Sequence, residues 1–393
     1  MTSEERHEAR YQRRKAKRKK KKDLYNKWYG NYDNIIAFDT LYDAFYLCKR
    51  GVSWKGSTQK YEIELTKNIY KTRQEILNGE KITKGFHYFT LKERGKERHI
   101  RSVHISERVV QKSVCDNCVL PILRRSFIND NGASLKGKGI DWTKKRLIKH
   151  LSDFYKEYKT DGWILLLDFS SYFDNILHEP IFKDLEKKIY DKRVIDLIKQ
   201  FIVPFGDKSL GLGSEISQVL ALNYTNVLDH YIKEVLHIKG YGRYMDDSYL
   251  IHHDKQYLKY CLEEIKKICD ELGIKINLKK IKLIKLSHPF VYLKVKYKLC
   301  EDTGRIIRKT GREFYTRTTR KIRKFRKLVD TGEMTFQDTL QPFRSWQGYL
   351  KRTDDWNKKN TINKLYYQTF HNEIIESLLN SVTGFNVPVI SQY

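Results

Sequence analysis

The stretch that decides the fold is Gly242-Arg243-Tyr244-Met245-Asp246-Asp247-Ser248-Tyr249-Leu250-Ile251. It reads as two short β-runs, 242–245 and 248–252, joined at the adjacent pair Asp246 and Asp247. Aspartate is a poor strand residue and a good turn residue, so we expect the pair at the tip of a hairpin. Two carboxylates held that close repel each other unless a cation neutralises them. A lone Asp-Asp pair is more often a solvated turn, so a metal site needs further evidence.

A second acidic strand end lies upstream, at Asp168. Residues 164–167 form a continuous apolar run, which indicates a strand buried on both faces, and the run ends abruptly in Asp168. A charge so close to a core strand is costly unless it is paired or binds a metal ion. Asp168, Asp246 and Asp247 together would offer oxygen ligands suited to Mg²⁺ or Mn²⁺. Polymerases use two such ions in nucleotidyl transfer.

These motifs resemble the palm of a reverse transcriptase. Tyr244-Met245-Asp246-Asp247 is preceded by Asp168 and, after four further residues, Phe173. Residues 211–218 sit where these enzymes carry a Gly-x-x-x-Ser loop leading into a helix, here expected over 219–236. Order and spacing agree across about residues 86–350. The resemblance implies an α+β right-hand polymerase fold with fingers, a palm whose antiparallel sheet carries the acidic triad, and a helical thumb.

The resemblance also implies an activity and its cofactor. The activity is RNA-directed DNA synthesis, in which deoxynucleotides are added to a 3′-hydroxyl with two Mg²⁺ ions, or Mn²⁺ as the alternative. Asp168 and Asp246 are expected to bridge both ions, Asp247 to support them, and the backbone carbonyl of Phe169 to complete the metal shell. The implied partners are an RNA template, a DNA or RNA primer and deoxynucleoside triphosphates.

Other positions match the family's substrate contacts. A hairpin is expected over 86–103, and its Lys92 and Arg98 match the basic residues that hold the triphosphate; Arg98 is the better candidate, because arginine grips phosphate bidentately. Phe173 matches the steric gate that would exclude a ribose 2′-hydroxyl. Lys280, chosen over Lys279, matches the lysine that protonates pyrophosphate. Each of these residues also has an ordinary reading, as a surface charge or a core aromatic residue.

The loop at 211–218 departs from the commonest reverse transcriptase pattern, which is Gln-Gly-x-x-x-Ser-Pro. Here Leu212 precedes Gly213, and the segment ends in Ser217 and Gln218. These residues resemble the enzymes of diversity-generating retroelements, in which the motif lies near the templating base and accompanies error-prone copying of adenines. Leucine cannot form the hydrogen bond that glutamine can, so the resemblance implies altered fidelity. The fingers motifs are similar to those of group II intron enzymes.

Composition supports a polyanionic partner. The chain has 393 residues, a formal net charge of +29, 27 Tyr and 18 Phe. Such an excess of positive charge predicts nucleic acid, and the aromatic residues supply surfaces for base stacking. The sequence has no run of about 18 apolar residues, so no transmembrane helix is predicted. The charged N-terminus does not resemble a secretory signal. We therefore expect a cytoplasmic protein that does not bind membranes.

The sequence divides into six parts by composition and motif. We expect a basic disordered tail (1–22), an N-terminal extension (23–85), fingers (86–160), a palm with residual fingers elements (161–298), a thumb (299–380) and a C-terminal tail (381–393). The tail is expected to contact nucleic acid, the alternative being a solubilising segment. Residues 290–297 alternate like a strand and resemble the primer grip, with Lys294 where the family usually has glycine.

Cysteine usage favours buried thiols over a metal site. Cys115 and Cys118 have a metal-like spacing, but a zinc site needs two more ligands and no second such pair is present. Both lie on the apolar face of a helix expected over 109–120. Structural thiols are therefore expected.

Three alternatives remain for the biological role. One is a retron- or intron-type enzyme, although the expected lack of maturase and endonuclease regions counts against an intron. An antiviral defence-associated reverse transcriptase would work with a structured noncoding RNA, and a catalytically idle RNA-binding scaffold would need no polymerase activity. The intact acidic triad argues against the scaffold. A basic accessory protein, as diversity-generating systems use, would also be compatible with this sequence.

Overall fold

The computed structural model describes residues 2–93, 96–211 and 213–383. The chain divides into two compact units, Met1–Leu147 with Leu165–Lys282, and Ile148–Ile164 with Leu283–Tyr393. Most of the predicted fingers and most of the predicted palm fall in the first unit, and the predicted thumb falls in the second. Among the described residues, no helix is long and apolar enough to cross a membrane.

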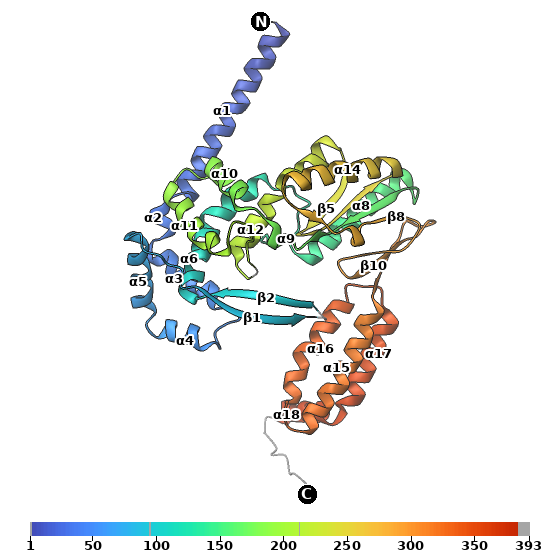
Figure 1. The fold of residues 1–393 in the computed structure, drawn as a ribbon. Helices are drawn as coiled ribbons and strands as arrows, with labels where there is room; N and C mark the ends of the chain where they lie inside the picture. Colours follow the sequence, from blue (N-terminus) through green and yellow to red (C-terminus); the bar gives the residue numbers. More distant parts are fainter. Residues whose placement is uncertain (1, 94–95, 212, 384–393) are drawn as a thin grey trace. The chain divides into compact units, whose positions relative to one another are not determined.

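Helices make up most of the first unit (Figure 1). The helices before the strand at Trp163–Leu167 are α1 (Ser3–Tyr29), α2 (Tyr32–Ile35), α3 (Phe38–Lys49), α4 (Gly56–Ile63), α5 (Leu65–Leu77), α6 (Ile105–Val114), the π-helix η1 (Cys115–Val119), α7 (Leu120–Leu123), the 3₁₀ turn η2 (Arg124–Ser126) and α8 (Ile140–Tyr158). Helix α8 crosses into the second unit. The helices after that strand are α9 (Tyr172–Asn175), α10 (His178–Lys188), α11 (Lys192–Ile202), η3 (Val203–Phe205), α12 (Glu215–Tyr224), α13 (Asn226–His230), the π-helix η4 (Tyr231–Val235), α14 (Lys255–Glu271) and η5 (Leu278–Lys280).

The N-terminal segment is a helix, which differs from the disordered tail expected for residues 1–22. Thr2 and Glu5 form a capping box at its start. Lys, Arg, Ala and Gln are all good helix formers, so the backbone preference of this segment is helical despite its charge. Composition alone identified the charge repulsion and overlooked that preference.

A four-stranded sheet carries the acidic motifs. Its order is β5-β6-β3-β8, with bounds β3 (Trp163–Leu167), β5 (Gly240–Tyr244), β6 (Asp247–His252) and β8 (Lys282–Lys285). Ile164 to Leu167 are buried, as their continuous apolar run predicted. A two-stranded antiparallel sheet, β4 (Phe169–Ser170) with β7 (Lys275–Ile276), follows directly after Asp168.

The hairpin predicted over 86–103 is present as β1 (Phe86–Glu93) and β2 (Lys96–Val103), which pair antiparallel. The helix expected over 219–236 begins earlier, at Glu215, and is interrupted at Thr225. The C-terminus of α14 is followed by Gly273, whose φ of +67° suits the position after a helix end.

In the second unit, three antiparallel strands precede a helical bundle. The strands are β9 (Phe290–Tyr292), β10 (Val295–Leu299) and β11 (Ile306–Thr310), in the order β11-β10-β9. Residues 290–297 therefore form a hairpin and not the single strand that their alternation predicted. Leu293 and Lys294 have φ of +44° and +65°, so the chain turns there. Two-residue turns of this kind favour glycine, so the family's glycine, expected from the resemblance at the position of Lys294, would suit this turn.

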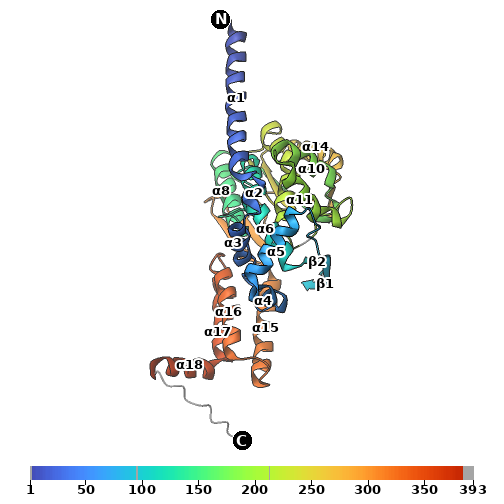
Figure 2. The ribbon, with the colours of Figure 1, turned by 90° about the vertical axis from the view of Figure 1, so that its left-hand side faces the viewer.

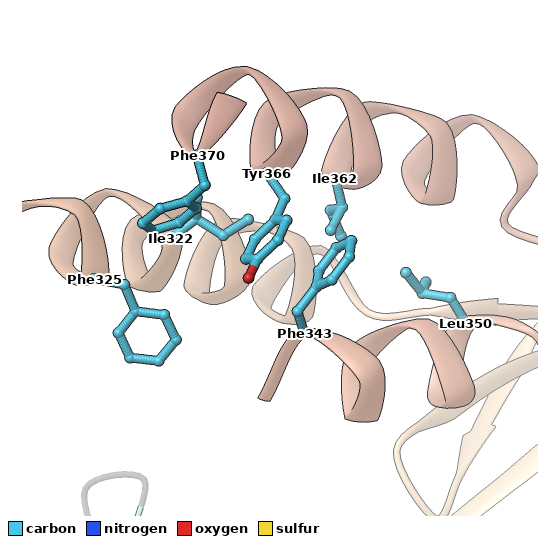
Figure 3. Close-up of a cluster of buried hydrophobic side chains, with 7 residues drawn as sticks. All are labelled: Ile322, Phe325, Phe343, Leu350, Ile362, Tyr366 and Phe370. Carbon is cyan, nitrogen blue, oxygen red and sulfur yellow. The ribbon is translucent and has the colours of Figure 1, made fainter. Parts of the chain in front are cut away.

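The bundle consists of α15 (Arg312–Asp330), α16 (Phe336–Leu350), α17 (Trp356–Thr369) and α18 (His371–Thr383). Its core comes from α15, α16, α17 and the residue after α17, and the side chains point toward one another between the helices (Figure 3). Phe343 and Tyr366 stack with ring centroids 3.7 Å apart. This bundle occupies the region expected to be the thumb.

The cysteines behave as buried thiols. Cys115 and Cys118 are fully buried in η1, and burial raises the pKa of the Cys118 thiol to about 12. The π-turn ends next to Pro121, which cannot donate a backbone hydrogen bond and crowds the preceding turn. All six cysteines are free.

Candidate active site

The turn that carries the acidic pair lies one residue earlier than predicted. Tyr244 pairs with Asp247 across β5 and β6, so the turn consists of Met245 and Asp246, and Asp247 is the first residue of β6. Met245 has a φ of +55°, which is unusual for a residue with a side chain and matches what a two-residue hairpin turn requires. Backbone strain of this kind is often found at functional sites.

The sheet brings Asp168 to this turn. Strand β3 lies beside β6, and Asp168 is the residue that follows β3. The backbone N–H of Phe169 donates to the carbonyl of Asp246 at 3.3 Å, and the Asp168 and Asp247 carboxyl groups are hydrogen-bonded to each other. The three aspartates predicted to act together therefore lie at one place in the first unit.

Negative charge is poorly balanced there. Asp168 is only 6% exposed. Burial and the charges of Asp246 and Asp168 together raise the pKa of Asp247 to about 7, although the charge of Lys280 lowers it. Lys280 Nζ bonds Asp168 Oδ2 at 2.6 Å, and the backbone N–H of Asn277 donates to the Asp168 carbonyl at 2.8 Å. Lys280 offsets part of this repulsion at Asp168, and a divalent cation would relieve the repulsion among the carboxyl groups.

Lys280 thus contacts the site, but its pKa favours a role other than the predicted one. Burial alone would lower the pKa of Lys280, yet the hydrogen bond and charge of Asp168, with Asp247 and Asp246, raise it above its usual value. A general acid works best with a pKa near the operating pH. Lys280 is therefore better suited to be a fixed positive charge, and its role as proton donor stays a prediction.

A tighter group of potential metal ligands lies elsewhere in the described part of the chain. Cys115, Asp116 and Glu215 have ligand atoms within 4.8 Å of one another. Lys112 Nζ already bonds Asp116 at 3.0 Å and Glu215 at 2.7 Å, and burial raises the pKa of the Cys115 thiol. Lys112 is therefore already paired with both carboxylates of this group.

A buried ion pair that the sequence analysis missed holds the turn. Arg243 and Asp229 are both fully buried, with Arg243 Nε and Nη2 bonded to Asp229 Oδ1 and Oδ2 at 2.7 and 2.5 Å. Arg243 Nη1 also donates to the carbonyl of Met245 at 3.0 Å. The signal was available, because an arginine inside an otherwise apolar strand needs a buried partner.

The predicted nucleotide contacts lie on segments next to the aspartates. Phe173, half-buried on α9, accepts the backbone N–H of Leu210 through its carbonyl at 3.0 Å. Gln218 Oε1 on α12 accepts from Ser134 Oγ at 2.6 Å. Gly213 has a φ of +112°. Leu212 lies outside the described residues. The roles of these residues stay predictions.

Lys92 and Arg98 do not act from one face of the hairpin. Lys92 pairs with Glu97 across the strands and Arg98 pairs with Leu91, and neighbouring pairs face alternate sides. Lys92 Nζ bonds Glu97 Oε1 at 2.9 Å. Arg98 shares its face with Ile100, which lies against Gly213: a Cβ added at that glycine would be 3.9 Å from Ile100 Cγ2. Arg98 is thus on the face that meets the 211–218 loop.

A buried polar chain connects α6 to that loop. Gln111 Nε2 donates to Glu107 Oε1 at 2.9 Å, and Ser214 Oγ donates to Gln111 Oε1 at 2.7 Å. Glu107 is 2% exposed, and this burial raises the pKa of its carboxyl group to about 7, against hydrogen bonds from Gln111 and the backbone of Lys84. The sequence pattern did not predict this series of hydrogen bonds, because Ser214 is far from Glu107 and Gln111 along the sequence.

A cleft of about 1410 Å³ reaches Tyr244, the residue that precedes the Met245–Asp246 turn. Its walls contain Tyr25 and Tyr29 from the last turns of α1, Gln218, and Tyr244 at the end of β5. Basic side chains line the space between them, namely Arg108, Lys112, Arg124, Arg125, Lys136 and Lys138. The charge and the aromatic residues suit nucleic acid.

Comparison with solved structures finds distant similarity to telomerases. Apo telomerase from Candida tropicalis truncated from its C-terminal domain is 12% identical with a TM-score of 0.44, and the match covers 57% of this chain and 55% of that one. Telomerase from Candida albicans in complex with a TWJ fragment of telomeric RNA is 11% identical with a TM-score of 0.47, covering 78% and 67%. The chain thus spans about half the length of the first of these relatives. No curated protein matches.

Comparison with protein families gives a match over more than half of the chain. Residues 91–297 match the family described as reverse transcriptase (RNA-dependent DNA polymerase). This range contains all three aspartates, Phe173, the 211–218 loop and Lys280, and it agrees with the right-hand polymerase fold expected from the motifs. The chain therefore belongs to the reverse transcriptase family.

Proposed function

We propose that this protein is an RNA-directed DNA polymerase that extends a primer with deoxynucleotides on an RNA template. The observation that carries the proposal is the gathering of three aspartates at one turn: Asp168 and Asp247 are in contact, and the carbonyl of Asp246 accepts the backbone N–H of Phe169. Their mutual repulsion raises the pKa of Asp247, although Lys280 bonds Asp168. A scaffold protein would gain nothing from this arrangement, because clustered carboxylates destabilise a fold.

The donor set fits hard divalent cations. Asp168, Asp246 and Asp247 offer carboxylate oxygens, which Mg²⁺ and Mn²⁺ prefer, and the raised pKa of Asp247 reports the repulsion that cations would relieve. We propose that these residues hold two such ions with the carbonyl of Phe169, and the bound ions would supply stabilisation of the charge on the attacking and leaving oxygens.

The protein's own residues would orient the substrates. In the reaction the primer 3′-oxygen forms a bond to the α-phosphorus, its proton leaves, and pyrophosphate departs. Arg98 would bind the triphosphate, Phe173 would exclude a ribose 2′-hydroxyl, and Lys280 would keep positive charge beside Asp168.

Primer extension tests the proposal. Purified protein would be given a DNA primer annealed to RNA, four deoxynucleotides and Mg²⁺. We expect templated extension by the wild type and by Asp270→Asn, which changes an exposed carboxylate on α14, and none by Asp246→Asn. Full extension by Asp246→Asn would contradict the mechanism. A lack of extension by the wild type on every primer and template would contradict the activity.

We further propose that the enzyme is of the diversity-generating type. The sequence of the 211–218 loop supports this, as does its attachment to α6 through Ser214 and Gln111 and to Ser134 through Gln218. We expect raised misincorporation opposite template adenine, which Leu212→Gln should reduce. Identical error spectra in the two proteins would contradict the assignment.

The natural template can be found by sequencing the RNA that co-purifies with the protein, together with the cDNA made from it. A defined RNA with adenine-biased errors in its cDNA is the expected result. A repetitive or untemplated product would instead favour the defence-associated alternative.

A further inference from the structure

Helix α1 is a strongly basic arm. Every residue from Arg10 to Lys22 is lysine or arginine except Tyr11, Gln12 and Ala16, and residues 10–21 are all exposed. Both views show the N-terminal part of α1 extending away from the other helices of the first unit (Figures 1 and 2). The arm also lies outside residues 91–297, the part that matches the reverse transcriptase family.

The arm is firmly attached at its C-terminal end. Asn26, which is buried, bonds the carbonyl of Lys188 and the backbone N–H of Tyr190, both at 3.0 Å. Tyr190 Oη donates to Asp23 Oδ1 at 2.7 Å, and the Arg125 guanidinium lies 4.0 Å from the Tyr25 ring centroid. The base of α1 is therefore part of the folded unit, and its direction is set by that packing.

The exposed stretch of α1 carries like-charge repulsion that a polyanion would relieve. From Ala9 to Lys22 the sequence has no acidic residue, so each basic side chain faces like charges three and four positions away. Such pairs each cost a few tenths of a kcal/mol, and they add up along the helix. The good helix propensity of these residues keeps the helix available, and an anionic partner would remove the repulsion.

The distribution of charge selects the kind of partner. A helix that lies on a membrane needs an apolar face opposite its basic face. Here the basic residues surround the axis, because they occupy nearly every consecutive position from Arg13 to Lys22. Charge on all sides suits contact with more than one line of phosphates, as a folded nucleic acid presents. At 1.5 Å per residue the basic stretch extends for about 18 Å, enough to contact several phosphates.

The base of the arm leads to the catalytic cleft. Tyr25 and Tyr29, on the last turns of α1, line the same cleft as Gln218 and Tyr244, and Tyr244 is two residues before Asp246. A nucleic acid held on α1 would therefore have a single-stranded segment within reach of a basic and aromatic path to the site.

We propose that α1 is a docking arm for the folded RNA that carries the template, binding its phosphate backbone through Arg10–Lys22 and presenting an unpaired segment to the cleft beside Tyr25 and Tyr29. RNA is the polyanion that this chain must hold if it acts as an RNA-directed polymerase, so the inference rests on the proposed function. It adds a binding surface that the polymerisation chemistry itself does not require.

The test compares two triple variants of the full chain. Lys19→Gln, Lys20→Gln and Lys21→Gln together remove charge from the arm and keep good helix formers. Lys255→Gln, Lys259→Gln and Lys267→Gln remove the same charge from exposed positions on α14. The probes are a labelled RNA hairpin with a single-stranded tail and a DNA hairpin of the same sequence, each titrated at several salt concentrations. Circular dichroism checks that both variants are folded.

We expect the arm variant to bind the RNA hairpin at least about tenfold more weakly at moderate salt, with a smaller dependence of affinity on salt, while the α14 variant changes little. Unchanged RNA binding by the arm variant would overturn the proposal, as would an equal loss in the α14 variant. Equal binding of the DNA hairpin, with an equal loss in the arm variant, would overturn the assignment to RNA.

A second readout separates this inference from the proposed function. Extension of a short DNA primer on a short RNA template, at saturating concentration, should be the same in the arm variant and the wild type, because α1 carries no catalytic group. Arm-dependent RNA binding without any extension by the wild type would contradict the polymerase activity and leave the docking arm supported. Loss of extension on the short duplex in the arm variant alone would overturn a role limited to docking.

Discussion

Two sets of charged side chains meet at the Met245–Asp246 turn. Arg243 and Asp229 are fully buried and satisfy each other with two hydrogen bonds, and Arg243 also bonds the Met245 carbonyl. Asp168, Asp246 and Asp247 are less enclosed as a group, and although Lys280 bonds Asp168, the charges of Asp246 and Asp168 still raise the pKa of Asp247. The balanced pair fixes the shape of the turn, and the unbalanced group is suited to bind cations. We therefore assign the positioning of the turn to the Arg243–Asp229 pair, and we propose the chemistry for the three aspartates.

The largest expected effect is on catalysis, when the unbalanced group loses a carboxylate. Asp168→Asn and Asp246→Asn should each lower the rate of primer extension by at least about a thousandfold, since each removes an anionic oxygen from the proposed metal site. The initial rate of extension measures this. Asp270→Asn is the matched control, and retention of more than a tenth of the wild-type rate by either site variant would contradict the assignment.

Breaking the balanced pair should instead act on stability. Asp229→Asn leaves the Arg243 guanidinium buried without an anion, which should lower the free energy of unfolding by about 3–5 kcal/mol. Asp247→Asn should leave stability unchanged or raise it, because it removes a buried negative charge next to others. Denaturant unfolding of both variants without divalent cations compares them. Equal destabilisation would show that the two sets of charges do not differ in the way described.

Glu107 has a third kind of charge environment. It is a buried carboxyl group that accepts hydrogen bonds, and no cation of the described residues is bonded to it. Its folded-state pKa of about 7 lies above the ordinary value, so the folded protein holds the proton more tightly than the unfolded chain. This stabilisation is present below about pH 4.5 and is lost as the pH rises through 7. Between pH 5 and 8 the wild type should therefore lose up to about 3 kcal/mol more stability than Glu107→Gln. If the free energies of unfolding of the two proteins changed in parallel with pH, the raised pKa of Glu107 would be contradicted.

Lys280 gives the smallest expected effect and distinguishes two roles. If it acts as a fixed charge, Lys280→Arg should keep most of the activity, and Lys280→Gln should lose about tenfold to a hundredfold. A proton donor cannot be replaced by arginine, which stays charged, so equal losses in both variants would favour the general-acid role. Single-turnover extension rates provide the comparison.

The sequence predicted most of the acidic site and none of its support. Asp168 was found because a charge follows directly after a buried strand, and the same reasoning would have identified Arg243 within β5. Its partner Asp229 lies on a separate helix, α13, so only the folded structure could reveal the pair. The turn was misplaced by one residue because pairing starts at Gly240 with Ile251, and that register sets the turn at Met245–Asp246.

Elsewhere the errors arose from competing local preferences. Charge predicted disorder for residues 1–22, whereas helix propensity and a capping box at Thr2 favour α1. Alternation predicted one strand over 290–297, and the positive φ of Leu293 and Lys294 makes it a hairpin. The motif assigned both Lys92 and Arg98 to the triphosphate, with Arg98 preferred, and strand pairing places them on opposite faces. In each case pairing or backbone geometry decided what composition could not.

A Mn²⁺ titration followed by electron paramagnetic resonance tests most directly whether the unbalanced carboxylates bind cations. The wild type and Asp270→Asn should bind Mn²⁺ that Mg²⁺ can displace, and Asp168→Asn and Asp246→Asn should lose that binding while remaining folded. Equal Mn²⁺ binding by all four proteins would contradict the assignment of Asp168, Asp246 and Asp247 as a metal site.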